Sequence, residues 1–277
     1  MGAPVIAPLG AELRAELRKT FSTRLWWALG IPVLVLSILY NLFGALFAGL
    51  DDGPASTLVP LLSLAYTMVL TSVFAAVGGI VGAAGEFRHH TAATTYLITP
   101  ARGRVLLAKL VLGGLVGALY AVAAAAVGVP AGMIGTGRLA DPGLMLGLVG
   151  VGMLVGALWA GIGAALGIAI GNQVGALVSV LIYLLLVDRV LALLLSSAES
   201  EAVAALAGYL PGKAADVVVY GFLADGLAMP GLGRRLVEEI ATVRYPPQWW
   251  VALLVLAAWT VVAAGLGWLV GARRDVT

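Results

Sequence analysis

Long apolar runs constrain the fold of this chain more than any other feature of its sequence. The chain contains six such runs, and the second of them, residues 58–84, contains no charged residue. An α-helix rises about 1.5 Å per residue, so about 20 residues cross a hydrocarbon core of about 30 Å. Only 11% of the residues are charged and the mean hydropathy is +1.05, whereas soluble domains are roughly 25% charged. The sequence therefore predicts an all-α, polytopic membrane protein.

The predicted organisation is a single transmembrane domain over residues 1–277. An amphipathic helix is expected before the first span, at about residues 8–23, because Leu13, Leu17 and Phe21 recur every four residues among charged side chains. It is too polar to cross a bilayer, so we expect it to lie at the inner interface; the alternative is a charged tail that frays. Six spans are expected at about residues 25–50, 58–84, 105–134, 144–170, 174–195 and 249–270.

The distribution of basic residues predicts the orientation of these spans. Short loops rich in Lys and Arg remain in the cytoplasm. In the short loops on the predicted outer side of the membrane, Arg138 is the only basic residue. We therefore expect a multi-pass protein of the inner (cytoplasmic) membrane with both termini cytoplasmic, and no nucleic-acid partner for its basic residues. The residues on the predicted cytoplasmic side are Arg14, Arg18, Lys19, Arg24, Arg88, Arg102, Arg104, Lys109, Arg273 and Arg274.

The long polar interval between the second and third spans, residues 85–109, is the main candidate for a functional element. Residues 87–99 are compatible with a short helix, and Pro100 would end it. A short helix held parallel to the membrane between two spans offers a surface to a cytoplasmic partner. The alternative is a basic loop that only fixes the orientation of the spans.

A family resemblance favours the first interpretation. The pattern of Glu86, Arg88, Thr91, Leu97, Pro100, Arg102 and Lys109 resembles the loop between spans two and three in permease subunits of ABC-2 type transporters. In that family the loop is the coupling helix, which sits in a cleft of the ATPase subunit; His90 stands where the family commonly has Gly. The resemblance implies an ATPase contact by Glu86, Phe87, Arg88, His89, Thr91, Tyr96, Leu97, Pro100 and Arg102.

The same resemblance implies the function and the partners. The chain has no G-x-x-x-x-G-K-[ST] segment, so it has no phosphate-binding loop of its own. ATP and Mg would be bound by a separate ATPase subunit, and this chain would bind no cofactor. A second permease copy, identical or closely similar, would complete the path in the lipid bilayer. The expected role is a non-enzymatic permease subunit that exports a hydrophobic or amphipathic substrate, such as a drug, an antibiotic, a lipid or a lipid-linked product.

Residues 196–248, before the last span, form neither a simple loop nor a soluble domain. Their apolar pieces are too short to cross a bilayer and are interrupted by Pro211-Gly212 and Pro230-Gly231. We expect half-helices that enter the outer leaflet and turn back, which the resemblance also implies. Irregular backbone at membrane depth needs protein or a wet cavity around it, so this region is a candidate lining for the exit of a pathway.

Asp188 and Arg189 form the one possible intramembrane polar site. They follow Val174, where the fifth span is expected to begin, after about 21 Å of helical rise. The preferred interpretation is a short span whose outer end already lies near water. The other interpretation is a functional charged site inside the bundle, and an ion- or proton-coupled carrier would use Asp188 as its relay.

Two weaker alternatives are a membrane-embedded protease and a scaffold. Glu238 and Glu239 followed by Arg244 are similar to the paired-Glu motif of CAAX-type proteases, but Arg244 lies one residue too far along. The two histidines, His89 and His90, are adjacent, so they point in different directions on a helix and predict no metal site. The chain has no cysteine, which excludes disulfides and thiolate chemistry.

Overall fold

The structure is a computed structural model that describes residues 9–50, 55–88, 102–137, 139–227 and 232–273. Its regular elements, within those ranges, are all helices, as the hydropathy pattern predicts. Six of them are long and apolar enough to cross a membrane. The expected all-α, six-span architecture is therefore confirmed for the described chain.

The helices agree with the expected spans to within a few residues. The fifth span is composite, because a short π-helical turn, η1, separates two α-helices. The amphipathic helix at the amino end is α1, Leu9–Ser22. The simple spans are α2 (Leu25–Ala48), α3 (Ala55–Arg88), α5 (Arg102–Thr136), α6 (Pro142–Ile170) and α12 (Trp249–Arg273). The composite span is α7 (Gln173–Ile182), η1 (Tyr183–Val187) and α8 (Asp188–Ser196).

Local capping explains the tight turn between α6 and α7. Gly171 ends α6 with a φ of 67°, a left-handed conformation that glycine adopts without strain. Asn172 then caps α7, because its Oδ1 accepts hydrogen bonds from the backbone N–H groups of Val174 and Gly175 at 3.0 and 3.1 Å. The chain thus reverses direction within two residues, and consecutive spans become antiparallel neighbours.

Glycines on α6 allow it to pack closely against two other spans. A Cβ on Gly163 would meet the backbone carbonyl of Ala76 on α3, and a Cβ on Gly156 would meet the backbone of Gly117 on α5 at 2.8 Å. Such close approach is the usual use of small residues between helices in lipid. Gly156 and Gly163 of α6 therefore pack inside the bundle.

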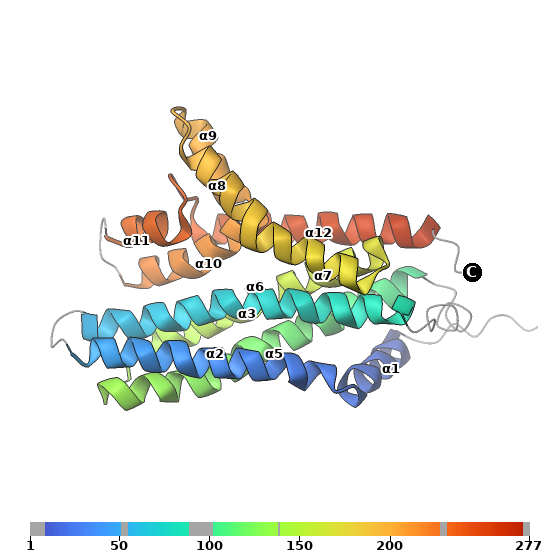
Figure 1. The fold of residues 1–277 in the computed structure, drawn as a ribbon, viewed down its shortest axis with the longest axis horizontal. Helices are drawn as coiled ribbons and strands as arrows, with labels where there is room; N and C mark the ends of the chain where they lie inside the picture. Colours follow the sequence, from blue (N-terminus) through green and yellow to red (C-terminus); the bar gives the residue numbers. More distant parts are fainter. Residues whose placement is uncertain (1–8, 51–54, 89–101, 138, 228–231, 274–277) are drawn as a thin grey trace, which may run out of the picture.

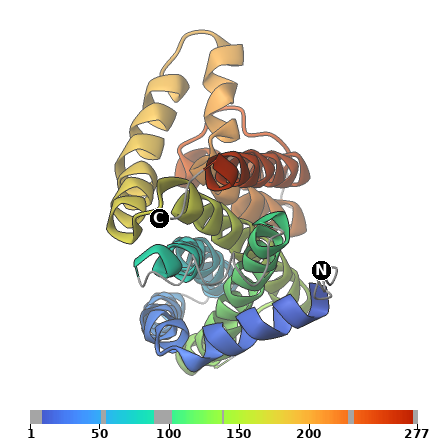
Figure 2. The ribbon, with the colours of Figure 1, turned by 90° about the vertical axis from the view of Figure 1, so that its right-hand side faces the viewer.

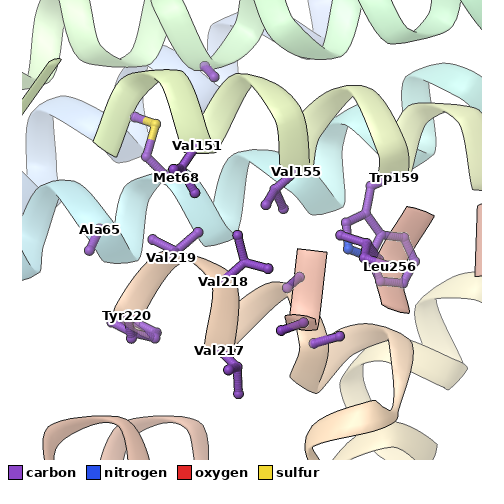
Figure 3. Packing of buried hydrophobic residues seen from close by; sticks show 14 of the residues in the cluster. Ala65, Met68, Val151, Val155, Trp159, Val217, Val218, Val219, Tyr220 and Leu256 are labelled. Atoms are coloured by element: carbon purple, nitrogen blue, oxygen red, sulfur yellow. The ribbon is translucent and has the colours of Figure 1, made fainter. Parts of the chain in front are cut away.

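The segment before the last span folds back into the core. It begins with α9 (Glu201–Ala205) and η2 (Leu206–Tyr209), continues as α10 (Pro211–Gly226), and ends with α11 (Leu232–Ala241). Glu201–Tyr209 and Pro211–Gly226 are bent by 87° against each other, the geometry of a broken span or a re-entrant loop. Figure 3 shows Val218 and Val219 of α10 close to Met68 of α3 and Val151 of α6. This short helix is thus part of the hydrophobic core.

The bundle has one end that carries α1, the last turn of α3, the start of α5 and the end of α12 (Figure 1). We call it the α1 end. At the opposite side of the fold, α8 and α9 form a hairpin that projects away from the other helices (Figures 1 and 2). The described basic residues that predict a cytoplasmic face lie on elements of the α1 end.

Candidate functional site

The predicted ATPase contact falls mostly outside the described residues. Glu86, Phe87 and Arg88 are the last residues of α3, and Arg102 is the first residue of α5. A separate helix starting at Phe87 was expected, but α3 continues to Arg88. The only residue near this point that disfavours a helix is Gly85, and a single glycine does not end a helix. The remaining predicted contacts, His89, Thr91, Tyr96, Leu97 and Pro100, lie outside the described residues.

An ion pair joins α1 to the start of α5. The Lys109 Nζ lies 3.5 Å from Glu16 Oε2, although the residues are 93 apart in sequence, and the Lys109 side chain is only 5% exposed. Lys19 Nζ lies 3.9 Å from the other oxygen of Glu16. Burial and the nearby Lys109 charge lower the pKa of Lys19, and Glu16 partly offsets this. The carboxylate therefore bridges two ammonium groups where α1 meets the bundle.

A second polar site lies where α8 passes the start of α10. Asp188 is only 2% exposed, and its Oδ1 accepts hydrogen bonds from the Tyr183 hydroxyl at 3.2 Å and from the Gly212 backbone N–H at 3.0 Å. Lys213, also 2% exposed, pairs with Asp216 at 3.1 Å. We call Tyr183, Asp188, Gly212, Lys213 and Asp216 the Asp188 cluster.

The π-helical turn η1 explains why Asp188 faces inward. A π-turn inserts an extra residue into the helix and so shifts the angular position of every residue after it. Leu185 and Leu186, within this turn, are 62% and 59% exposed, whereas Asp188 directly after it is buried. The apolar side chains therefore face outward while the carboxylate faces α10.

Asp188 supplies the cap that α10 lacks in its own sequence. Leu210 at the N-cap position has no oxygen to offer, and Pro211 has no N–H, so the next backbone donor is that of Gly212. A carboxylate at a helix N-terminus is stabilised by the hydrogen bond and by the helix dipole. A Cβ on Gly212 would meet the Asp188 carboxylate. The contact thus requires both an acid at 188 and the absence of a side chain at 212.

The structure places Asp188 and Arg189 on a helical path that continues to Ser196. Asp188 is buried there. Arg189 lies on the exposed side of α8. The structure therefore separates the two predicted residues, and it gathers Tyr183, Gly212, Lys213 and Asp216 around Asp188, which sequence spacing did not indicate.

A third polar group, which the sequence analysis missed, ties α2 to α3 and α5. The Ser37 hydroxyl donates to the Ala124 carbonyl at 2.7 Å, and Asn41 Nδ2 donates to Ser37 O at 2.9 Å and to Thr67 Oγ1 at 3.1 Å. Ser37, Asn41 and Thr67 are at most 2% exposed. The signal in the sequence was a serine and an asparagine four residues apart, on one face of an apolar helix.

Glu238 and Arg244 of the protease-like motif take part in hydrogen bonds that hold helices together or in place. Arg234 Nε donates to Glu238 Oε1 at 3.0 Å within α11, and Arg244 Nη1 donates to the Ser196 carbonyl at 3.2 Å. Across the part of the chain that the structure describes, no group of three His, Cys, Asp or Glu residues is placed to hold a metal ion.

These helices define a helical polytopic membrane protein with about six candidate spans. No protein-family model and no curated protein sequence matches the chain. Its function is therefore inferred from its own elements and residues.

Proposed function

We propose that the chain is the permease subunit of an ABC-2 type exporter, driven by ATP that a separate subunit hydrolyses. The observation that carries this proposal is that α3 ends and α5 begins at the α1 end; these helices have 34 and 35 residues. Residues 89–101, which we call the connecting segment, join the two helices in the sequence. The element order adds support: an amphipathic α1, six spans, and a bent helix pair before the last span.

The two long helices would transmit movement of the connecting segment into the bundle. A continuous helix is stiff over its length, so a displacement at one end moves its other end. Helix α3 packs along α6, where Gly79 lies close to the backbone of Ala160. Helix α5 packs along both α2 and α6, and Gly117 of α5 lies close to the backbone of Gly156 in α6. A partner that moves the connecting segment would therefore act on four spans together.

The chemistry of the connecting segment and its flanks fits a protein partner. Glu86, Arg88 and Arg102 supply charges of both signs, and Phe87, Tyr96 and Leu97 supply apolar groups that could fill pockets on the partner. Charges of this kind determine partner choice, while buried aromatic groups contribute most of the affinity. ATP and Mg would bind to two ATPase subunits, and two permease copies would enclose the path for a hydrophobic or amphipathic substrate.

Purification with a mild detergent tests the proposal. A tagged chain should elute with a stoichiometric nucleotide-binding subunit, and the complex should hydrolyse ATP in vesicles. Charge reversal by Glu86→Lys or Arg102→Glu should uncouple hydrolysis from transport, whereas Arg138→Glu in the loop before α6 serves as the matched control. Unchanged coupling in both reversal variants would contradict the role of the connecting segment.

An ion-coupled carrier is a second candidate, because Asp188 is buried in the bundle. Acidic residues within membrane spans often serve as proton or ion relays. Asp188→Asn keeps an oxygen that can accept from Gly212 but removes the ionisable group. Loss of transport by Asp188→Asn in vesicles without any ATPase would favour the carrier; retained ATP-driven transport would favour the permease.

A further inference from the structure

A cavity of about 530 Å³ opens at the α1 end, between α1, α2, α3 and α5. This volume lies within the range of about 300–1,000 Å³ that small-molecule sites occupy. The residues that characterise its lining are Glu16, Lys19, Gly82, Lys109, Leu112 and Tyr120.

The lining is amphipathic along the direction of the spans. Two ammonium groups, of Lys19 and Lys109, lie beside the single described carboxylate of the lining, Glu16. Further into the bundle the walls are apolar, with Leu112 and the ring of Tyr120, whose hydroxyl is occupied by a 2.6 Å hydrogen bond to the Trp26 carbonyl. The cavity therefore suits a molecule with an anionic group at one end and hydrocarbon at the other.

One glycine of α3 borders a part of the cavity that no described atom fills. A Cβ on Gly79 would meet the backbone carbonyl of Ala160, so helix packing accounts for that glycine. A Cβ on Gly82, which lines the cavity, would meet no described atom within 4 Å. Helix packing in the described chain gives no reason for the glycine at 82, whereas an occupant lying against the α3 backbone does.

We propose that this cavity is a site for an anionic phospholipid, with one acyl chain along the glycine face of α3 and the phosphate beside Lys19 and Lys109. The amphipathic α1, which borders the cavity, belongs to a class of helix that lies at the level of the headgroups. A lipid of the adjacent leaflet would thus place its phosphate at the depth of these ammonium groups. The site holds a bound lipid and does not depend on whether the chain is a permease.

The electrostatics also favour an anion. Burial and the charge of Lys109 both lower the pKa of Lys19, so the cavity makes the charged form of Lys19 less favourable than in water. A phosphate nearby would offset that cost. A zwitterionic lipid provides a weaker net attraction, and inorganic phosphate alone would leave the apolar walls unfilled.

Photo-crosslinking in nanodiscs tests this site with two probes that share one photoactivatable acyl chain: phosphatidylglycerol and phosphatidylcholine. The phosphatidylglycerol probe should label α3 or α5 at the cavity more strongly than the phosphatidylcholine probe. Gly82→Leu fills the space and should abolish that labelling. Gly150→Leu is the matched control, because a Cβ there also meets no described atom within 4 Å and Gly150 does not line the cavity.

Lys19→Gln provides an independent variant, since the Lys19 side chain is 43% exposed and its replacement should not prevent folding. It should weaken phosphatidylglycerol labelling about tenfold, the effect of losing one charge-assisted contact, and leave phosphatidylcholine labelling unchanged. Three outcomes would each overturn the proposal: undiminished labelling of Gly82→Leu, equal labelling by the two lipids, or displacement of the probe by millimolar inorganic phosphate.

Discussion

The Asp188 carboxylate in α8 caps α10 through a 3.0 Å hydrogen bond from the backbone N–H of Gly212. The contact joins the composite fifth span to the helix that inserts into the core before the last span. Since α8 also packs on α9 and η2, this hydrogen bond fixes the position at which the projecting hairpin returns to the bundle.

Gly212→Ala should destabilise the protein, because the new methyl group would meet the Asp188 carboxylate and displace it from the start of α10. Losing a charge-assisted hydrogen bond in a buried site costs about 1–3 kcal/mol. Thermal unfolding in detergent measures the effect. Gly265→Ala is the control, since a Cβ at that position in α12 meets no described atom within 4 Å; equal melting temperatures for the two variants would contradict the capping role.

Asp188→Asn and Asp188→Leu should separate the capping role of Asp188 from its charge. Asparagine is also a good N-cap residue, so Asp188→Asn should lose at most a few tenths to about 1 kcal/mol. Asp188→Leu leaves the Gly212 N–H without its acceptor and should lose clearly more. Denaturant titration of both variants gives the comparison, and an Asn variant as unstable as the Leu variant would show that charge, not capping, holds the junction.

Asn41→Leu should weaken the attachment of α2 to α3. Asn41 Nδ2 would no longer donate to Thr67 Oγ1, but the Thr67 hydroxyl would still donate to the Ser63 carbonyl at 2.8 Å, so no buried donor is left unpaired. Hydrogen bonds between spans contribute about 0.6 kcal/mol on average, and a loss of that size is expected in SDS-induced unfolding. Ser22→Ala, at an exposed site in α1, should have no effect.

Lys109→Met should raise the pKa of Lys19 toward its ordinary value of 10.5. The substitution removes the neighbouring positive charge but keeps the Glu16 carboxylate, which stabilises the charged form of Lys19. The chain has only three lysines, Lys19, Lys109 and Lys213, so reductive ¹³C-methylation gives few NMR signals to assign. A titration midpoint of Lys19 that is unchanged in Lys109→Met would show that burial alone lowers its pKa.

The spans could be predicted from sequence because lipid leaves few choices for a long uncharged run, and each expected span lies within a few residues of a helix. The cap at Asp188 could not be predicted in the same way. It depends on a π-turn that changes the direction of one side chain and on a glycine 24 residues later. Likewise, Gly79 and Gly82 look alike in sequence, yet a Cβ on Gly79 would meet the backbone of Ala160 in α6, whereas a Cβ on Gly82 would meet no described atom within 4 Å.

The connecting segment between α3 and α5 offers the most direct test of the proposed function. A photo-crosslinking amino acid at Leu97 in intact cells, compared with one at Leu139 in the loop before α6, reports which proteins contact each side of the membrane. If the chain is such a permease, Leu97 alone crosslinks to a nucleotide-binding subunit, and the yield changes when ATP is depleted. Labelling of position 97 by a membrane-impermeant reagent added outside the cells, with no such crosslink, would contradict the proposed function.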